Sequence, residues 1–402
     1  MAKRINGGIT APKGFVAAGI VAGIKKNKAL DLALIASVAP GPMAGVFTTN
    51  KVPAAPVILG RQQIKHGRGQ AILVNSGNAN AFTGKEGLLH ARLTSRLVAK
   101  ALGISPRMAF IGSTGVIGVP LPMDAIAAGI PLLVSQLNRK GHHQAAQAIM
   151  TTDTRPKEIA FRDTIGGKTV TIGGIAKGSG MIHPDMATML GYLTTDALID
   201  RTVLQRTLAA VNRETFNCIS VDGETSTNDT VLCLANGSAG NPLIKNGTPD
   251  HVRFKNLLYR VCHYLAMEVV RDGEGATKII EFQIHHAANE KAAKQFANTL
   301  ATSPLVKTAI FGADPNWGRI VAALGRSGPA LKPEKIHIRF NNIPIVKDGK
   351  GLGPKVEQRI KTMMQKPTLK ISISLGQGKA SSHIWTTDLT YDYVKINASY
   401  RS

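Results

Sequence analysis

One alanine–threonine pair in this sequence has the chemistry to create a nucleophile by cutting the chain. Thr188 follows Ala187, a small residue whose carbonyl is open to attack by the Thr188 hydroxyl. Acyl transfer from nitrogen to oxygen, followed by hydrolysis of the ester, would free the Thr188 α-amine, which has an unperturbed pKa of about 7.7–8.0. An N-terminal threonine carries its own base, so the pair predicts self-cleavage between Ala187 and Thr188.

An alanine–threonine pair alone is a weak signal, because most such pairs are ordinary helix or strand residues. The flanking sequence strengthens the hypothesis. Gly178 and Gly180 allow backbone conformations closed to other residues, so the chain can turn sharply before the candidate bond. The apolar residues 189–193 after Thr188 are typical of buried chain.

The segment 177–190, with the sequence KGSGMIHPDMATML, resembles the self-cleavage motif of the ornithine acetyltransferase family. These enzymes are the bifunctional glutamate N-acetyltransferases of arginine biosynthesis. Further family-like motifs follow in the family's order over nearly the whole chain, at residues 74–81 (VNSGNANA), 113–118 (STGVIG), 273–278 (GEGATK), 312–319 (GADPNWGR) and 388–397 (DLTYDYVKIN).

The resemblance implies roles for particular residues. It places an oxyanion hole at Thr114 and Gly115, and substrate contacts at Thr151, Lys177, Thr188, Glu274, Asn397 and Ser402. From the residues alone, Thr114 and Gly115 could form a simple turn, Lys177 could be a surface lysine, and Glu274 could be solvated. Ser402 stands where many relatives carry threonine, and it keeps the hydroxyl.

The resemblance also implies an activity. An α chain of residues 1–187 and a β chain of residues 188–402 would stay together, with two copies of each in a heterotetramer. Thr188 would take the acetyl group from N2-acetylornithine and pass it to glutamate by a ping-pong mechanism, with acetyl-CoA as a second donor in bifunctional members. This exchange requires no metal and no bound cofactor.

Two other functions are weighed against this one. The first is an N-terminal-threonine amidase or aminopeptidase on the same scaffold, in which water replaces glutamate. The second is nucleic-acid binding, suggested by a formal net charge of +24. The charge is spread along the chain and only 5% of the residues are aromatic, so a basic, solvated surface is the favoured interpretation.

Other features restrict the class of protein. Cys218, Cys233 and Cys262 include no Cys-x-x-Cys pair, which argues against a disulfide framework or structural zinc and fits a reducing cytoplasm. No run is long enough to span a bilayer, and residues 14–24 are expected to form a core strand and a turn. Dinucleotide-binding, Walker A, nucleophile-elbow and His-Glu-x-x-His motifs are missing from the sequence.

The sequence pattern is mixed α and β. Asp200 is expected to cap a helix that carries Leu204, Leu208 and Val211, and a longer helix should run through Leu257, Val261, Leu265 and Val269 to end near Gly273. Leu89, Leu93 and Leu97 also recur at helical spacing before Gly103, while residues 71–74, 169–173, 336–346 and 369–384 are expected to form strands.

The resemblance implies an α/β fold like that of the self-processing aminopeptidases, with two sheets layered between helices in an α-β-β-α sandwich. A catalytic core over residues 1–285 and a smaller α+β C-terminal domain over residues 286–402, covering the site, are expected. The evidence within the sequence for a boundary near residues 282–288 is only a change of pattern.

The cleavage hypothesis predicts two fragments that meet at Ala187 and Thr188 when the mature protein is weighed intact under denaturing conditions. Thr188→Ala should leave a single chain without transfer activity, because it removes the attacking hydroxyl. A Thr188→Ala protein that is both cleaved and active would contradict the assignment.

Overall fold

Two β-sheets organise the computed structural model, which describes residues 2–183 and 189–399. Within those residues the first sheet contains β1 (Lys3–Ile5), β2 (Phe15–Ile20), β3 (Leu32–Phe47), β4 (Arg68–Asn78), β5 (Ala109–Val116), β6 (Lys157–Ile165), β7 (Lys168–Lys177), β8 (Leu190–Thr195) and β9 (Thr230–Ala235). The strands follow the order β1-β6-β7-β8-β9-β3-β4-β5, and β2 pairs with β3. The β4–β5 and β8–β9 pairs are parallel, and the other pairs are antiparallel.

The long strand β3 joins two halves of this sheet. Its residues 32–36 pair with β4 and its residues 43–47 pair with β9, with an irregular register between Ala36 and Gly41. A Cβ atom on Gly41 would lie 1.8 Å from the Ala235 carbonyl oxygen, so only glycine allows the backbones to approach this closely. The irregularity lets one strand contribute to both layers.

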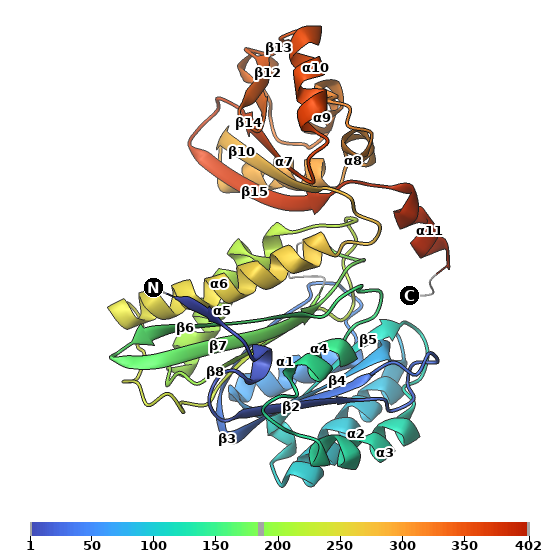
Figure 1. Ribbon diagram of the computed structural model, residues 1–402, viewed down its shortest axis with the longest axis vertical. Helices are drawn as coiled ribbons and strands as arrows, with labels where there is room; N and C mark the ends of the chain where they lie inside the picture. Colours follow the sequence, from blue (N-terminus) through green and yellow to red (C-terminus); the bar gives the residue numbers. More distant parts are fainter. Residues whose placement is uncertain (1, 184–188, 400–402) are drawn as a thin grey trace.

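Helices cover the outer face of each half (Figure 1). The helices of this part of the chain are α1 (Ala55–Gln63), α2 (Gly84–Leu102), α3 (Met123–Ser135), α4 (His142–Ala148), α5 (Arg201–Glu214) and α6 (Pro249–Arg271). α5 and α6 share one apolar core with β6–β9, and α2 and α3 share another with β2–β5. A third core, containing Phe15, Phe110 and Tyr192, lies between the two halves. The expected α-β-β-α layering is confirmed.

The helix ends predicted at Asp200 and Gly103 are confirmed, but the buried face predicted for α2 is not. The Asp200 side chain accepts hydrogen bonds from the backbone N–H groups of Thr202 and Val203 at the start of α5. Gly103 adopts the left-handed conformation at the end of α2. However, Leu89 and Leu93 are 61% and 44% exposed, because α2 turns smaller side chains toward the sheet.

The second sheet belongs to the C-terminal part of the chain. Its described strands are β10 (Ile279–Ala287), β11 (His337–Phe340), β12 (Ile343–Lys347), β13 (Lys350–Gly351), β14 (Thr368–Ser374) and β15 (Ala380–Thr387), in the order β13-β12-β11-β14-β10-β15. The accompanying helices are α7 (Glu290–Ala301), α8 (Pro304–Phe311), α9 (Trp317–Gly325) and α10 (Pro354–Met363). The predicted boundary between residues 285 and 286 falls inside β10, which pairs with both β14 and β15.

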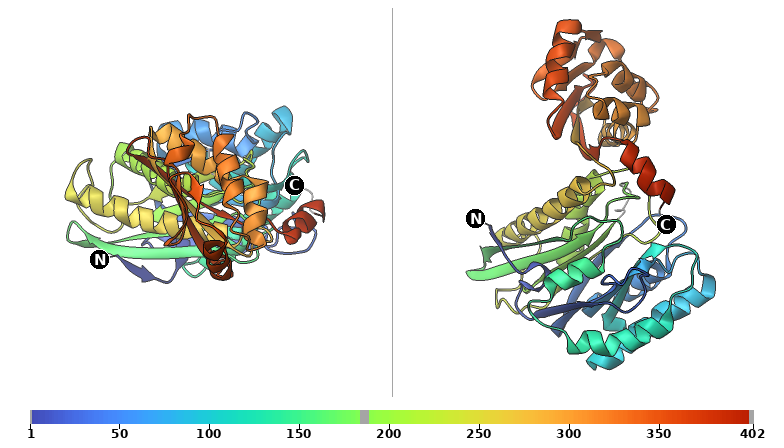
Figure 2. Two further views of the ribbon diagram at one scale, coloured as in Figure 1. Left: turned by 90° about the horizontal axis from the view of Figure 1, so that it is seen from above. Right: turned by 45° about the vertical axis from the view of Figure 1, so that its right-hand side comes forward.

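The last helix, α11 (Tyr391–Ser399), leaves the second sheet and runs back toward the first (Figures 1 and 2). Its base is fixed by Asp388, whose carboxylate accepts hydrogen bonds from the backbone N–H groups of Thr277 and Lys278. The chain between α6 and β10 is therefore tied to the segment that leads into α11. Across residues 2–183 and 189–399, no helix combines the length and apolar character needed to cross a membrane.

Candidate active site

A cavity at the ends of β5 and β7 brings together six of the predicted site residues. Its lining contains Thr114, Gly115, Thr151, Lys177, Glu274 and Asn397. These residues are far apart in the sequence, and they come from the nine-stranded sheet, the loops beside it and α11. The predicted nucleophile Thr188, its neighbour Ala187 and the terminal Ser402 lie outside the described residues.

Gly115 follows Thr114 at the end of β5, where the backbone of β4 passes very close. The parallel register pairs Ser76 with Thr114 and Gly77 with Gly115. Gly115 has φ +130°, and a Cβ atom there would lie 2.3 Å from the Gly77 carbonyl carbon. The position therefore requires glycine for two reasons: its backbone conformation and the lack of space.

Lys177 is the last residue of β7 and is buried. Its Nζ donates to the Thr114 hydroxyl oxygen across 3.4 Å, which links the lysine to the end of β5. Burial lowers the pKa of Lys177, while the negative charges of Asp153, Asp229 and Glu274 act in the opposite direction. The charged form of a lysine that lines a cavity can bind a carboxylate ligand.

The described chain approaches the cavity from both sides of residues 184–188. Met181 lies before this segment and Met189 after it, and both line the cavity. Asp222 accepts hydrogen bonds from the backbone N–H groups of Met181, at 2.6 Å, and Ile182, at 2.9 Å. After the segment, Leu190 pairs directly with Lys177. Leu190, two residues after Thr188, is therefore the strand partner of the buried lysine.

Glu274 brings a carboxylate to the cavity from the turn after α6. Its backbone N–H donates to the Ser179 carbonyl at 2.9 Å, and its side-chain Oε2 accepts from Asn397 Nδ2 at 2.9 Å. The second bond connects α11 to the cavity, so the C-terminal segment does reach the predicted substrate contacts. A carboxylate here can accept hydrogen bonds from an ammonium group of a ligand.

Three residues at the site were not predicted from the sequence: Asn228 and Asp229, which line the cavity, and Asp153, which lies behind the lining. Asn228 donates from Nδ2 to the carbonyls of Ala79, at 2.6 Å, and Ser113, at 2.8 Å, which fixes the loop before β9 against the end of β5. Asp229 lines the cavity beside it. The Asp153 carboxylate accepts hydrogen bonds from the backbone N–H groups of Thr151 and Gly178. Single asparagine and aspartate residues in loops carry no spacing signal that would separate them from ordinary turn residues.

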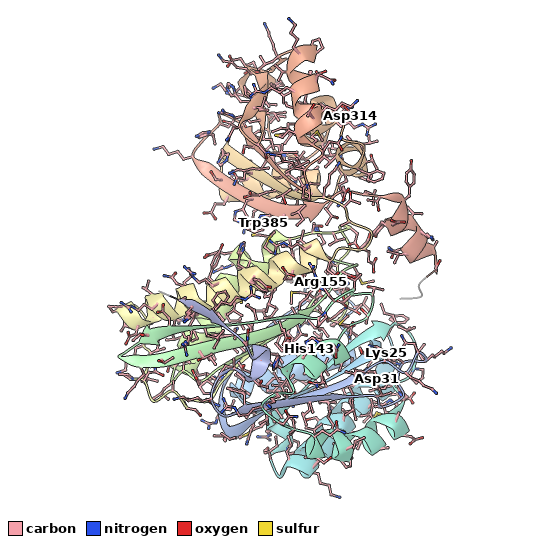
Figure 3. The ribbon with its side chains drawn as sticks, viewed as in Figure 1. Lys25, Asp31, His143, Arg155, Asp314 and Trp385 are labelled. Atoms are coloured by element: carbon pink, nitrogen blue, oxygen red, sulfur yellow. The ribbon has the colours of Figure 1, made fainter. Side chains whose placement is uncertain are left out.

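From the sequence, the motif at residues 312–319 is expected to shape a packed turn near the site; in the structure it caps a helix and does not line the cavity. The Asn316 side chain accepts a hydrogen bond from the Arg319 backbone N–H and caps α9. Arg319 donates to the Leu305 carbonyl, and Trp317 donates to Glu357. Asp314 lies in the part built on β10–β15 (Figure 3).

Metal binding was given low weight from the sequence. The described ranges contain no group of three His, Cys, Asp or Glu side chains arranged to hold a metal ion. The adjacent His142 and His143 both contact the Glu158 carboxylate through their Nδ1 atoms.

The fold and the cavity together define a class of protein. It is a layered α-β-β-α protein with a polar cavity, which both the buried Lys177 and Glu274 line. Opposite charges placed in this way suit a ligand that carries both a carboxylate and an amine.

Comparisons with known proteins give the family. Residues 16–402 match the model of the ArgJ family. The chain is 50% identical over 398 residues to the arginine biosynthesis bifunctional protein ArgJ of Symbiobacterium thermophilum, which covers 98% of this chain and 99% of that protein. It is 48% identical over 390 residues to the protein of the same name from Geobacter sulfurreducens, over 97% and 99% of the two chains. The chain belongs to the ArgJ family.

A solved structure is also similar. It is the ornithine acetyltransferase of Mycobacterium tuberculosis complexed with ornithine, with 42% identity and a TM-score of 0.44. The match covers 46% of this chain and 99% of that one.

The packing at Gly115 predicts that Gly115→Ala lowers the free energy of unfolding by about 2 kcal/mol or more, because the new methyl group overlaps the β4 backbone. Gly118→Ala is the matched control. Gly118 lies in the same loop with φ +80°, but a Cβ atom there would meet nothing within 4 Å. Urea unfolding of both variants separates the effect of the overlap from that of the backbone conformation, and equal losses would contradict the account.

Proposed function

We propose that this chain is a glutamate N-acetyltransferase, which moves the acetyl group of N2-acetylornithine to glutamate in arginine biosynthesis. Membership of the ArgJ family supports acetyl transfer in this pathway. The observation that carries the proposal for this cavity is the meeting of Thr114, Gly115, Lys177 and Glu274 beside Met189, the residue that follows Thr188.

In the first half-reaction, the Thr188 hydroxyl attacks the acetyl carbonyl of N2-acetylornithine, and the Thr188 α-amine accepts the hydroxyl proton. The Thr114 hydroxyl and the Gly115 backbone N–H donate hydrogen bonds to the oxyanion. The amide C–N bond breaks, the proton passes to the leaving nitrogen, and ornithine departs. The acetyl group remains on Thr188 as an ester.

In the second half-reaction, the α-amine of glutamate attacks this ester. The Thr188 α-amine takes the proton from the attacking nitrogen and returns it to the threonine oxygen as the C–O bond breaks. Lys177 binds a substrate carboxylate, and Glu274 with Asn397 holds the polar end of the amino acid. Thr151 and Ser402 complete the proposed substrate contacts. One amide replaces another, so the exchange needs no metal or bound cofactor.

The experiment that tests this function follows the acetyl group. The purified protein is incubated with N2-acetylornithine, with and without glutamate. We expect ornithine release to depend on glutamate and to match the formation of N-acetylglutamate. Ornithine released at equal rates in both mixtures, with free acetate appearing, would instead show the amidase reaction, in which water is the acceptor.

The proposed oxyanion hole predicts that Thr114→Val lowers kcat by about 100- to 1,000-fold, because valine keeps the shape of threonine but has no hydroxyl donor. Thr114→Ser keeps the donor and should retain most of the activity. Steady-state kinetics of the two variants check the prediction. A fully active Thr114→Val would remove Thr114 from the mechanism.

The proposal also covers the second acetyl donor, the cellular compartment and the subunit assembly. The chain would use acetyl-CoA as a second donor, work in the cytoplasm, and assemble as two α and two β chains produced by cleavage between Ala187 and Thr188. An assay with acetyl-CoA in place of N2-acetylornithine tests donor breadth.

A further inference from the structure

Three buried ionic side chains lie behind the cavity wall. Lys157 Nζ lies 2.7 Å from Asp153 Oδ1 and 2.5 Å from Asp272 Oδ2. The side chains of Lys157 and Asp153 are 0% exposed, and that of Asp272 is 3% exposed. We call these three residues the Lys157 network. Burying charges is costly, and a buried ion pair is by itself weak evidence for stability, so its position calls for another explanation.

The network is bonded to the segments that carry predicted substrate contacts. Asp153 Oδ1 also accepts from the backbone N–H of Gly178 at 2.7 Å, directly after Lys177. Asp153 Oδ2 accepts from the backbone N–H of Thr151 at 3.0 Å. Asp272 lies two residues before Glu274 and accepts from the backbone N–H of Thr154 at 3.0 Å. One set of charges thus joins the segments of Thr151, Lys177 and Glu274.

The charges around Lys177 come from several elements. Asp153 precedes β6, Asp229 precedes β9 and Glu274 follows α6, and all three favour the charged lysine. Lys157 on β6 disfavours it, and so does Lys25, which lies in the loop between β2 and β3 (Figure 3). Among these groups, Asp153 has the largest effect in favour of the charged form.

Asp153 itself remains ionised. Burial alone would raise the pKa of Asp153, but Lys177 and Lys157, together with the hydrogen bonds from Lys157 and Thr151, lower it to about 2. Its charge is therefore constant over any pH range in which the transfer is measured.

We propose that Asp153 is a positioning residue for the acetyl transfer: its carboxylate binds the backbone N–H of Gly178 and so fixes Lys177 at the substrate carboxylate. Lys157 holds Asp153 in place and limits the strength of its field at Lys177. This inference rests on the proposed function, because it assigns the binding of a substrate carboxylate to Lys177.

The two members of one ion pair then have opposite electrostatic effects. Asp153→Asn removes a negative charge near Lys177, so the lysine should lose its proton at lower pH. Lys157→Met removes a positive charge, so the lysine should keep its proton to higher pH. Both substitutions break the same ion pair, so a purely structural role would change both variants in the same direction.

The pH dependence of kcat/KM distinguishes an electrostatic role of this ion pair from a purely structural one. The Thr188 α-amine and the amine of glutamate act without a proton, so their titration raises activity as pH rises. A fall in kcat/KM at high pH then reports a group that must stay protonated, which the proposal identifies as Lys177. We expect this fall to move down by about one pH unit in Asp153→Asn and up in Lys157→Met. The value of kcat/KM should also drop about tenfold in Asp153→Asn.

Glu268→Gln is the matched control. Glu268 lies on α6 one turn before Asp272, and its carboxylate pairs with Arg155 and Arg271 near the surface. The substitution removes the same charge as Asp153→Asn without touching the Lys157 network, so its pH profile should match that of the wild type.

A second measurement does not depend on turnover. The rate at which acetic anhydride labels Lys177, followed by peptide mass spectrometry over a range of pH, gives the pKa of this lysine in each folded variant. Opposite shifts in Asp153→Asn and Lys157→Met support the inference. If only one of the two variants folds, a shift in the direction stated for it, with none in Glu268→Gln, supports the inference. Unchanged values, or shifts in the same direction, overturn it. A wild type that shows no transfer would instead refute the proposed function.

Discussion

A lysine ammonium held away from water is the constraint on which the rest of this site depends. Lys177 ends β7, where burial lowers its pKa and nearby negative groups act in the opposite direction. Asp153, Asp229 and Glu274 supply this negative field from three different segments. The fold must therefore hold each of the three segments so that its carboxylate stays close to Lys177.

The layered fold provides that fixed geometry. The parallel ends of β4 and β5 bring the Gly77 backbone against Gly115, and β7 pairs with β8 so that Lys177 lies opposite Leu190. The turn after α6 brings Glu274 to the same cavity, where Asn397 of α11 binds it. The C-terminal part of the chain thus contributes to a site built mainly by the nine-stranded sheet.

The sequence predicted those features that depend on local chemistry. The Asp200 cap, the long helix α6 and strand β7 follow from capping residues and periodicity. The site residues followed from resemblance, and their roles remain predictions. The Lys157 network could not be predicted, because Lys157 and Asp272 are 115 residues apart and meet only in the folded chain. The start of the second sheet was also missed: β10 begins at Ile279, directly after the turn that contains Gly273 and Gly275, and lies within the range assigned to the catalytic core.

The central claim is that residue 188 carries the acetyl group between two amino acids. The most direct measurement is the mass of the fragment that begins at Thr188 after brief exposure to N2-acetylornithine without an acceptor, followed by mapping of its first peptide. The account predicts a gain of one acetyl group on Thr188 that disappears when glutamate is added. A fragment that never gains this mass while transfer proceeds at the normal rate would contradict the account.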